Sequence, residues 1–393
     1  MRDRRRSLLR LKLVLYVLLG AGIAAASLYF IDLTRSIDLR ASPLAYDWEI
    51  LWDATRGGHV QWDAGMFSPP WALIFILPLS YLSLNVSWAI MTLLGAAALT
   101  LSVPRYREWQ WQLIGVLMLG ASYSYRRYFT DTNYEAITIL AVLAMLVAYR
   151  RRWPVLFAVA GMISTIKPQT TFLLVLVAAL YVYQTATRRF FLQVAMLVGA
   201  MAVLSTLWAG KPWLDTLTTR SFDYGISLYV TGSKLGAPDW TLHAIQVLII
   251  GVTLGVAYLG NRELSRAKTG MLIAASLLSA PFSNLHSALV LLAIGIVPLA
   301  LERPRVGIWL VLLFDVHYID IFGLTYNFFD MHTGYGQELW TTILIVSWLT
   351  LTTTVYITER QEAASYWMRL RASLAQRGHE SRDKRRRIEH TPA

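Results

Sequence analysis

Residues 269–305 read TGMLIAASLLSAPFSNLHSALVLLAIGIVPLALERPR, and this stretch decides the fold class. It holds two apolar runs, 269–283 and 285–301, joined at a short polar turn and followed by two arginines. A helix that crosses a bilayer needs about 20 predominantly apolar residues, or fewer if it is short or re-entrant. The stretch therefore predicts two membrane helices that are connected by a tight turn.

The same pattern recurs along the whole chain. The other apolar runs are 13–31, 86–103, 111–128, 134–149, 153–166, 169–187, 190–208, 242–260, 306–322 and 339–358. Of the 393 residues, 56% are hydrophobic and 15% are charged, whereas about a quarter of a typical soluble domain is charged. We therefore predict an all-α polytopic membrane protein with about twelve transmembrane helices. The composition excludes a disordered chain, a coiled coil and most cytosolic enzymes.

Basic residues cluster between the apolar runs. The clusters are Arg2 to Lys12, Arg105 and Arg107, Arg150 to Arg152, Arg188 and Arg189, Arg262 to Lys268, Arg303 and Arg305, and the tail from Arg360 to Arg387. Cytoplasmic loops of membrane proteins are enriched in Lys and Arg, so we assign every cluster and both termini to the cytoplasm. We expect the basic tail to be a solvated flank rather than a nucleic-acid-binding segment, because the rest of the chain lies in a bilayer.

This sidedness constrains the first part of the chain. The run 13–31 is long for the apolar region of a signal peptide, so we predict an uncleaved first helix. The segment 70–84 is apolar but short, and Pro78 interrupts it. If this segment is a juxtamembrane or re-entrant helix in the first outer loop, every later basic cluster falls inside. We predict one membrane domain over 1–358 and a disordered cytoplasmic tail over 359–393.

The same topology places several polar segments outside the membrane. They are 32–69, 129–133, the Lys167-Pro168 turn, 209–241, the turn near Ser283 to His286, and 323–338. The chain has no cysteine, which excludes disulfides, thiolate metal sites and thiol catalysis. It also lacks a glycine-rich phosphate loop and an acidic pair with metal-site spacing, so we expect neither an ATP-driven mechanism nor a required metal or other cofactor.

The first outer loop is long, aromatic and acidic. Its candidate bases are Asp47, Glu49, Asp53 and Asp63. Asp47 differs from the others because aromatic residues flank it, namely Tyr46, Trp48 and Trp52. Such surroundings are typical of a partly dry, carbohydrate-facing pocket, in which a carboxylate would serve as a general base. The alternative is that these acids only solvate the loop or cap helices.

The outer turn after the run 111–128 supplies further candidates. Asp131 and Asn133 lie in this turn, and Arg126 and Arg127 come just before it. Two arginines at the outer end of a helix oppose the general charge bias, so we consider them candidates for binding an anionic group such as a phosphate. The alternative is that their side chains extend toward the interface.

Two more outer turns carry one ionisable residue each. Lys167 precedes Pro168, which would begin the next helix, and its apolar surroundings predict an anionic partner. The alternative is a simple turn lysine. His286 follows a polar turn between two apolar runs and is a functional candidate, unless it bonds a neighbouring helix for structural reasons. Because the charge pattern places all four turns on one side, we expect them to line one extracytoplasmic cavity.

At these residues the chain resembles the polyprenyl-phosphate-dependent GT-C glycosyltransferases, most closely the alpha-mannosyltransferase-like glycosyltransferase family 87. The matching positions are Asp47, Trp52 and Ala54, Phe67-Ser68-Pro69-Pro70, Asn133, Lys167-Pro168, and the segment from Ser279 to His286. The resemblance covers residues 10–300. The chain departs from the family pattern at the Gly-Gln part of the turn before Asn133, at the Tyr of the Pro-Pro motif, and by one residue inserted between Ser279 and Pro281.

The resemblance implies a GT-C-like bundle and an inverting glycosyl transfer outside the cytoplasm. A polyprenyl-phosphate donor gives a mannose-like sugar to a glycolipid or glycan acceptor, and Asp47 is the general base. Lys167, His286, Arg126 and Arg127 would face the donor phosphate. The substrate-binding set would be Tyr46, Trp48, Glu49, Trp52, Asp131 and Asn133. The resemblance places the enzyme in the plasma membrane. A transporter or flippase of a lipid-linked substrate is the alternative, followed by a non-catalytic membrane scaffold.

Overall fold

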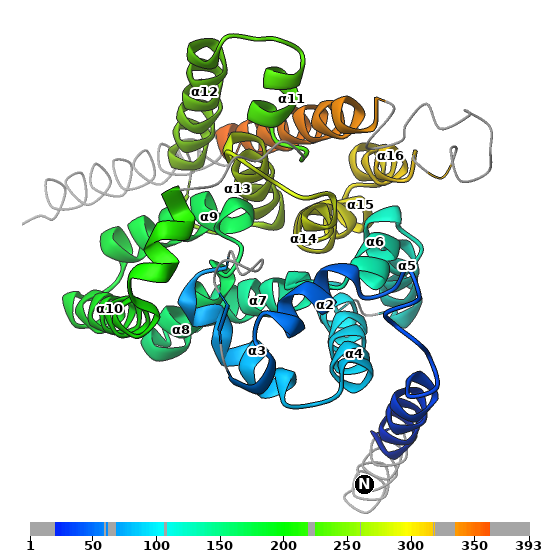
Figure 1. Ribbon diagram of the computed structural model, residues 1–393. Coiled ribbons are helices and arrows are strands. Elements are labelled where there is room, and N and C mark those ends of the chain that lie inside the picture. The colour runs from blue at the N-terminus through cyan, green and yellow to red at the C-terminus, as the bar shows by residue number, and fades with distance from the viewer. Residues whose placement is uncertain are drawn as a thin grey trace, which may run out of the picture.

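The computed structural model describes residues 20–58, 60–61, 68–105, 108–218, 225–259, 261–316, 318 and 335–361. Within these ranges the regular structure is helical throughout, and no strand occurs (Figure 1). The first described helix is Gly20–Thr34, which extends away from the bundle at the lower right of the view (Figure 1). The all-α class predicted from the apolar runs is confirmed.

The elements follow one another along the chain in a simple order. The first half contains α2 (Tyr46–Asp53), η1 (Arg56–Gly58), η3 (Pro70–Ala72), α3 (Leu73–Ser80), α4 (Leu84–Ser102), α5 (Trp109–Gly120), α6 (Tyr123–Asp131), α7 (Glu135–Arg151), α8 (Pro154–Ser164) and α9 (Pro168–Thr185). The second half contains α10 (Arg188–Thr218), α11 (Leu228–Lys234), α12 (Asp239–Tyr258), α13 (Arg266–Ser279), η4 (Leu285–Ser287), α14 (Ala288–Leu291), the π-helix η5 (Leu292–Ile296), α15 (Val297–Glu302) and α16 (Pro304–Phe314). The last described helix is Gly336–Gln361.

Five of the described helices are long and apolar enough to cross a membrane. They are Leu84–Ser102, Arg188–Gly210, Asp239–Tyr258, Leu285–Glu302 and Gly336–Gln361. The bent pair of α6 and α7 makes a sixth if it is one span. Shorter apolar helices are Gly20–Thr34, Pro70–Ser80, Pro154–Ser164 and Pro304–Phe314. The chain is therefore a multi-pass membrane protein, and the larger count of about twelve crossings remains a prediction.

One expected helix is divided in two. The run 111–128 predicts a single helix, but α5 ends at Gly120 and α6 begins at Tyr123. The side chain of Ser122 caps α6, because its Oγ accepts the backbone N–H of Tyr125 at 3.2 Å. Asp315 adds a second acceptor at this helix start, 2.9 Å from the backbone nitrogen of Tyr123. The break thus has its own hydrogen bonds, which hydropathy does not report.

The main core lies around the span Leu285–Glu302. In the most apolar part of this span, 89% of the residues are buried within the protein. The corresponding share for the span Arg188–Gly210 is 11%. The former therefore runs through the middle of the bundle, whereas the latter, at the start of α10, lies at its edge (Figure 1). The helices α4, α7, α13 and α16 contact the central span, and α8 and α9 share its apolar core by packing on α7 and α13.

A smaller core attaches the first loop to the bundle. It joins α2, η3 and α3 to the start of α4 and of α7. Trp48 of α2 donates from its indole to Ser87 Oγ at 2.9 Å, and Trp52 donates to the carbonyl of Leu82 at 3.0 Å. These bonds fix α2 against the N-terminal end of α4 (Figure 1). The sequence predicted a loop here, and the segment 70–80 is a short apolar helix as expected.

A buried ion pair holds the last helix at the other end of the bundle. Lys268 Nζ lies 2.7 Å from Glu359 Oε1, and both side chains are almost fully buried. The backbone of Asn261 bonds both partners, accepting from Lys268 at 2.9 Å and donating to Glu359 at 2.8 Å. The predicted basic tail beyond this helix, residues 362–393, lies outside the described residues.

Candidate active site

The site forms where α6 and α7 meet at an angle of 118°. Thr132 at this bend has a left-handed φ of 47°, which a β-branched residue rarely adopts. Its hydroxyl accepts the indole N–H of Trp88 at 2.9 Å. Asn133 follows, and its side-chain oxygen accepts the backbone N–H of Tyr134 at 2.8 Å. The carboxamide of Asn133 is thus oriented by the backbone of the bend.

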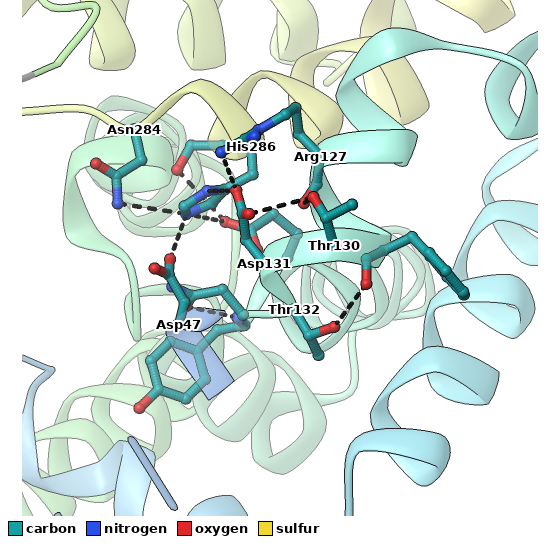
Figure 2. A network of polar contacts seen from close by, with 12 residues as sticks. Asp47, Arg127, Thr130, Asp131, Thr132, Asn284 and His286 are labelled. Atoms are coloured by element: carbon teal, nitrogen blue, oxygen red, sulfur yellow. Dashed lines mark hydrogen bonds and ion pairs between the residues drawn. The ribbon is translucent and has the colours of Figure 1, made fainter. Parts of the chain in front are cut away.

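The carboxylate of Asp47 meets this bend from α2. Its Oδ2 accepts the Nδ2–H of Asn133 at 2.8 Å and lies 3.6 Å from Nε2 of His286 (Figure 2). The residue before the helix, Ala45, is fully buried and has a left-handed φ of 63°. That conformation starts α2 directly beside the site. The side chain of Asp47 is 24% exposed, so one oriented carboxylate remains accessible.

His286 lies among three carboxylates from three different elements. In addition to Asp47 on α2, its Nδ1 lies 3.8 Å from Asp131 Oδ2 on α6, and its Nε2 lies 3.6 Å from Glu135 Oε1 on α7. Asn284 contacts Nε2 at 3.3 Å from the segment before η4 (Figure 2). The imidazole therefore connects α2, the bend between α6 and α7, and the entrance to the central span.

Two cations bind the deeper carboxylates. Arg127 makes an ion pair with Asp131 at 2.7 Å on the same helix, as Figure 2 shows. Lys167 pairs with Glu135, and both of these side chains are buried. Ser287 Oγ contributes a weaker contact to the same oxygen of Glu135 at 3.4 Å. Lys167 has the anionic partner that its apolar surroundings predict.

The sequence interpretation did not include Glu135 among the site residues. The sequence feature that could have identified it is an ionisable residue at the start of the run 134–149, directly after a predicted outer turn. A carboxylate is costly in such a position unless it has a charged partner or a function. The structure brings it together with Asp47, Asp131, Lys167 and His286.

Other predicted residues lie elsewhere. Glu49 and Asp53 pair with Arg40, at 3.2 and 2.8 Å, on the exposed face of α2. Tyr46 and Arg126 are exposed, and among the described residues neither makes a hydrogen bond or ion pair with the group around His286. Asp63 falls in 62–67, outside the described residues.

The substrate-binding role predicted for Trp48 and Trp52 does not agree with their burial. Trp48 is 0% exposed and Trp52 is 6% exposed, because both rings pack in the smaller core. The guanidinium of Arg56 also lies over the Trp52 ring, 4.9 Å from its centroid. Neither ring offers a face to a sugar, and both act by holding α2 in place.

The arrangement is suited to general base chemistry. It presents one partly exposed carboxylate, oriented by an amide and an imidazole, with buried charges behind it. Such a carboxylate accepts a proton from a bound hydroxyl group. Within the described ranges, no group of three or more His, Asp or Glu side chains is arranged to hold a metal ion.

Comparison with known proteins identifies the family of the chain. The chain matches the model of glycosyltransferase family 87 over residues 67–291. That range includes Asn133, Glu135, Lys167 and His286, whereas Asp47 precedes it. No curated protein matches the chain. Because the matched range exceeds half of the 393 residues, the chain belongs to glycosyltransferase family 87 and is a membrane glycosyltransferase.

Proposed function

We propose that the enzyme transfers a mannose-like sugar from a polyprenyl-phosphate donor to a hydroxyl group of a glycolipid or glycan acceptor. The reaction takes place at the extracytoplasmic face of the plasma membrane, and Asp47 is the general base. One observation carries the proposal. Of the three carboxylates around His286, Asp47 is the most exposed, at 24% against 11% for Asp131 and 0% for Glu135.

The proposed reaction is a single displacement. Asp47 takes the proton of the acceptor hydroxyl while its oxygen attacks the anomeric carbon of the donor sugar. The bond from that carbon to the phosphate oxygen breaks through an oxocarbenium-like state, and the lipid phosphate leaves with both bonding electrons. Because attack and departure take place on opposite faces of the sugar, the configuration inverts.

The leaving phosphate needs positive charge rather than a proton. Arg127 keeps 38% of its side chain exposed beside Asp131, and Arg126 is exposed one residue earlier. In the proposal these two arginines contact the donor phosphate. Lys167 is only 5% exposed and paired with Glu135, so it acts on the phosphate through its field together with His286.

The decisive experiment compares Asp47→Asn with the wild type in sugar transfer. Purified protein in detergent receives a panel of polyprenyl-phosphate sugars, with total membrane glycolipid as the acceptor. Loss of a general base lowers the rate by about 10²- to 10⁴-fold. Asp53→Asn is the matched control on the same helix. Its pair with Arg40 is 43% exposed on the Asp53 side, and such surface pairs contribute about 1 kcal/mol or less.

Three results are informative. Transfer that is lost in Asp47→Asn and retained in Asp53→Asn supports the proposal, and the active donor identifies the sugar. Transfer that survives in Asp47→Asn removes Asp47 as the base. If folded wild-type protein neither transfers sugar nor hydrolyses any donor, the alternative of a transporter or flippase of a lipid-linked substrate is favoured.

A further inference from the structure

The most deeply buried charge at the site is Glu135. Its side chain is 0% exposed, at the first position of α7. A carboxylate in such a place is stable only when it is paired and hydrogen-bonded. The Oε1 atom of Glu135 meets this condition through Lys167 on the turn between α8 and α9, and it lies 3.6 Å from His286 Nε2 before η4.

Negative side chains around the imidazole outnumber positive ones. The carboxylates of Asp47, Asp131 and Glu135 face the ring from α2, α6 and α7, and the neutral Asn284 faces it from its own segment. Behind them lie two permanent cations, Arg127 on Asp131 and Lys167 on Glu135. With a neutral ring, three acids would share two cations in a poorly solvated cluster. With an imidazolium, the six side chains balance.

We propose that Glu135 is a positioning residue that holds His286 as an imidazolium with its Nε2 turned toward Asp47. The idea rests on the proposed function, in which Asp47 is the base. Glu135 and Asp47 both face Nε2 of the ring, and Lys167 pairs with the same Glu135 oxygen that lies near this nitrogen. Glu135, Lys167 and His286 need not touch the acceptor hydroxyl.

This arrangement has two consequences for the transfer reaction. Like charges in close proximity favour protonation of one carboxylate, and a cation between them opposes this. The imidazolium therefore offsets the charge of the neighbouring carboxylates at Asp47, which accepts the proton in the proposed reaction. It also places positive charge near the position where the leaving phosphate gains negative charge.

The test is a spectroscopic measurement that requires neither donor nor acceptor. The protein is labelled with 15N-histidine, and the His286 signals are assigned by comparison with His286→Gln, since the chain has seven histidines. At pH 7.5 an ordinary histidine is about nine-tenths neutral. We expect imidazolium-type 15N shifts for His286 in the wild type, neutral-type shifts in Glu135→Gln, and imidazolium-type shifts again in Glu135→Asp.

A matched control exists at the other end of α13. The pair of Lys268 and Glu359 is also a buried lysine–carboxylate pair. Lys268 lies eleven residues before Ser279, which corresponds to about 16 Å along the helix. Glu359→Gln should leave the His286 signals unchanged. If Glu135→Gln does not fold because Lys167 is left unpaired, Glu135→Gln with Lys167→Met removes one charge of each sign. Asp47 and Asp131 then still outnumber Arg127 by one, so His286 should keep imidazolium-type shifts in this double variant, with Glu359→Gln plus Lys268→Met as its control.

The outcomes separate this proposal from the proposed function. Imidazolium shifts that persist in Glu135→Gln, or neutral-type shifts in the double variant, overturn the proposal whatever happens to activity. In the transfer assay we expect Glu135→Gln to lower kcat at least about tenfold, with the donor KM within about twofold, and Glu135→Asp to restore part of kcat. An equal loss in both variants also overturns it. Absence of transfer by the wild type would instead count against the proposed function, while the 15N shifts would still decide the role of Glu135.

Discussion

Asn133 connects the bend between α6 and α7 to the carboxylate of Asp47. Its oxygen is occupied by the backbone of Tyr134, so its amide group is directed to Asp47 at 2.8 Å. A hydrogen bond to a charged group contributes about 1.5–3 kcal/mol. We therefore expect Asn133→Ala to lower kcat by about 10- to 100-fold, measured in the transfer assay.

A stability measurement separates this effect from unfolding. Asn133→Asp keeps the acceptor for the Tyr134 N–H but places a second carboxylate against Asp47, so its loss of activity should exceed that of Asn133→Ala. The melting temperature in detergent should be higher for Asn133→Asp than for Asn133→Ala, because the aspartate retains the bond to the Tyr134 backbone. Full activity in Asn133→Ala would contradict the assigned orientation of Asp47.

The charge pattern was a good guide to some site residues, whereas proximity in the sequence was a poor guide to others. Asp47, Lys167 and His286 were predicted to lie on one side and are in one network. Trp48 was expected beside Asp47 in the pocket, because it is its neighbour in the chain. Since 46–53 is a helix, successive residues point about 100° apart, and Trp48 and Trp52, four residues apart, share the buried face.

At the scale of elements, α13 and the central span pack through a close contact between two glycines. Gly295 in the π-helix η5 faces Gly270 in α13, and a Cβ added at Gly295 would lie 2.6 Å from the Gly270 Cα. Small residues let membrane helices approach in this way. We expect Gly295→Ala to destabilise the protein by about 1–3 kcal/mol, since backbone must move. Thermal unfolding in detergent measures this.

The control for this prediction is Gly255→Ala in α12. A Cβ at that position meets no atom within 4 Å, so the substitution should leave the melting temperature unchanged or raise it slightly. Equal melting temperatures of the two alanine variants would show that the contact between α13 and η5 accommodates a methyl group without loss of stability.

The helices themselves were largely predictable, whereas their interruptions were not. Apolar runs located the helices because bilayer and protein core both select apolar side chains. The break between α5 and α6 depends on Asp315, which accepts the backbone N–H of Tyr123 from 192 positions away in the sequence. The bend at Thr132 depends on Trp88, which donates to the Thr132 hydroxyl from 44 positions away. No local pattern contains such partners.

At the scale of the whole molecule, hydropathy does not distinguish lipid from protein as the neighbour of a helix. The span Leu285–Glu302 and the span Arg188–Gly210 are similarly apolar, yet the first is central and the second peripheral. Several helices of the bundle, such as α8 and α16, have only 11 residues. A count of crossings therefore depends on where the membrane lies, which charge asymmetry predicts better than length does.

Single cysteines in this cysteine-free chain test that charge argument directly. Asp38, Arg151 and Arg188 are exposed positions before α4, at the end of α7 and at the start of α10. If α4, α5 with α6, and α7 each cross once, Asp38 lies outside and Arg151 inside. The hairpin of α8 and α9 then returns the chain to the inside at Arg188. We expect a membrane-impermeant maleimide to label Asp38→Cys in intact cells, and Arg151→Cys and Arg188→Cys only after permeabilisation. Labelling of Arg151→Cys from outside would move the bend between α6 and α7, and the site with it, to the cytoplasmic face, where the same carboxylate would need a donor with its head group on that face.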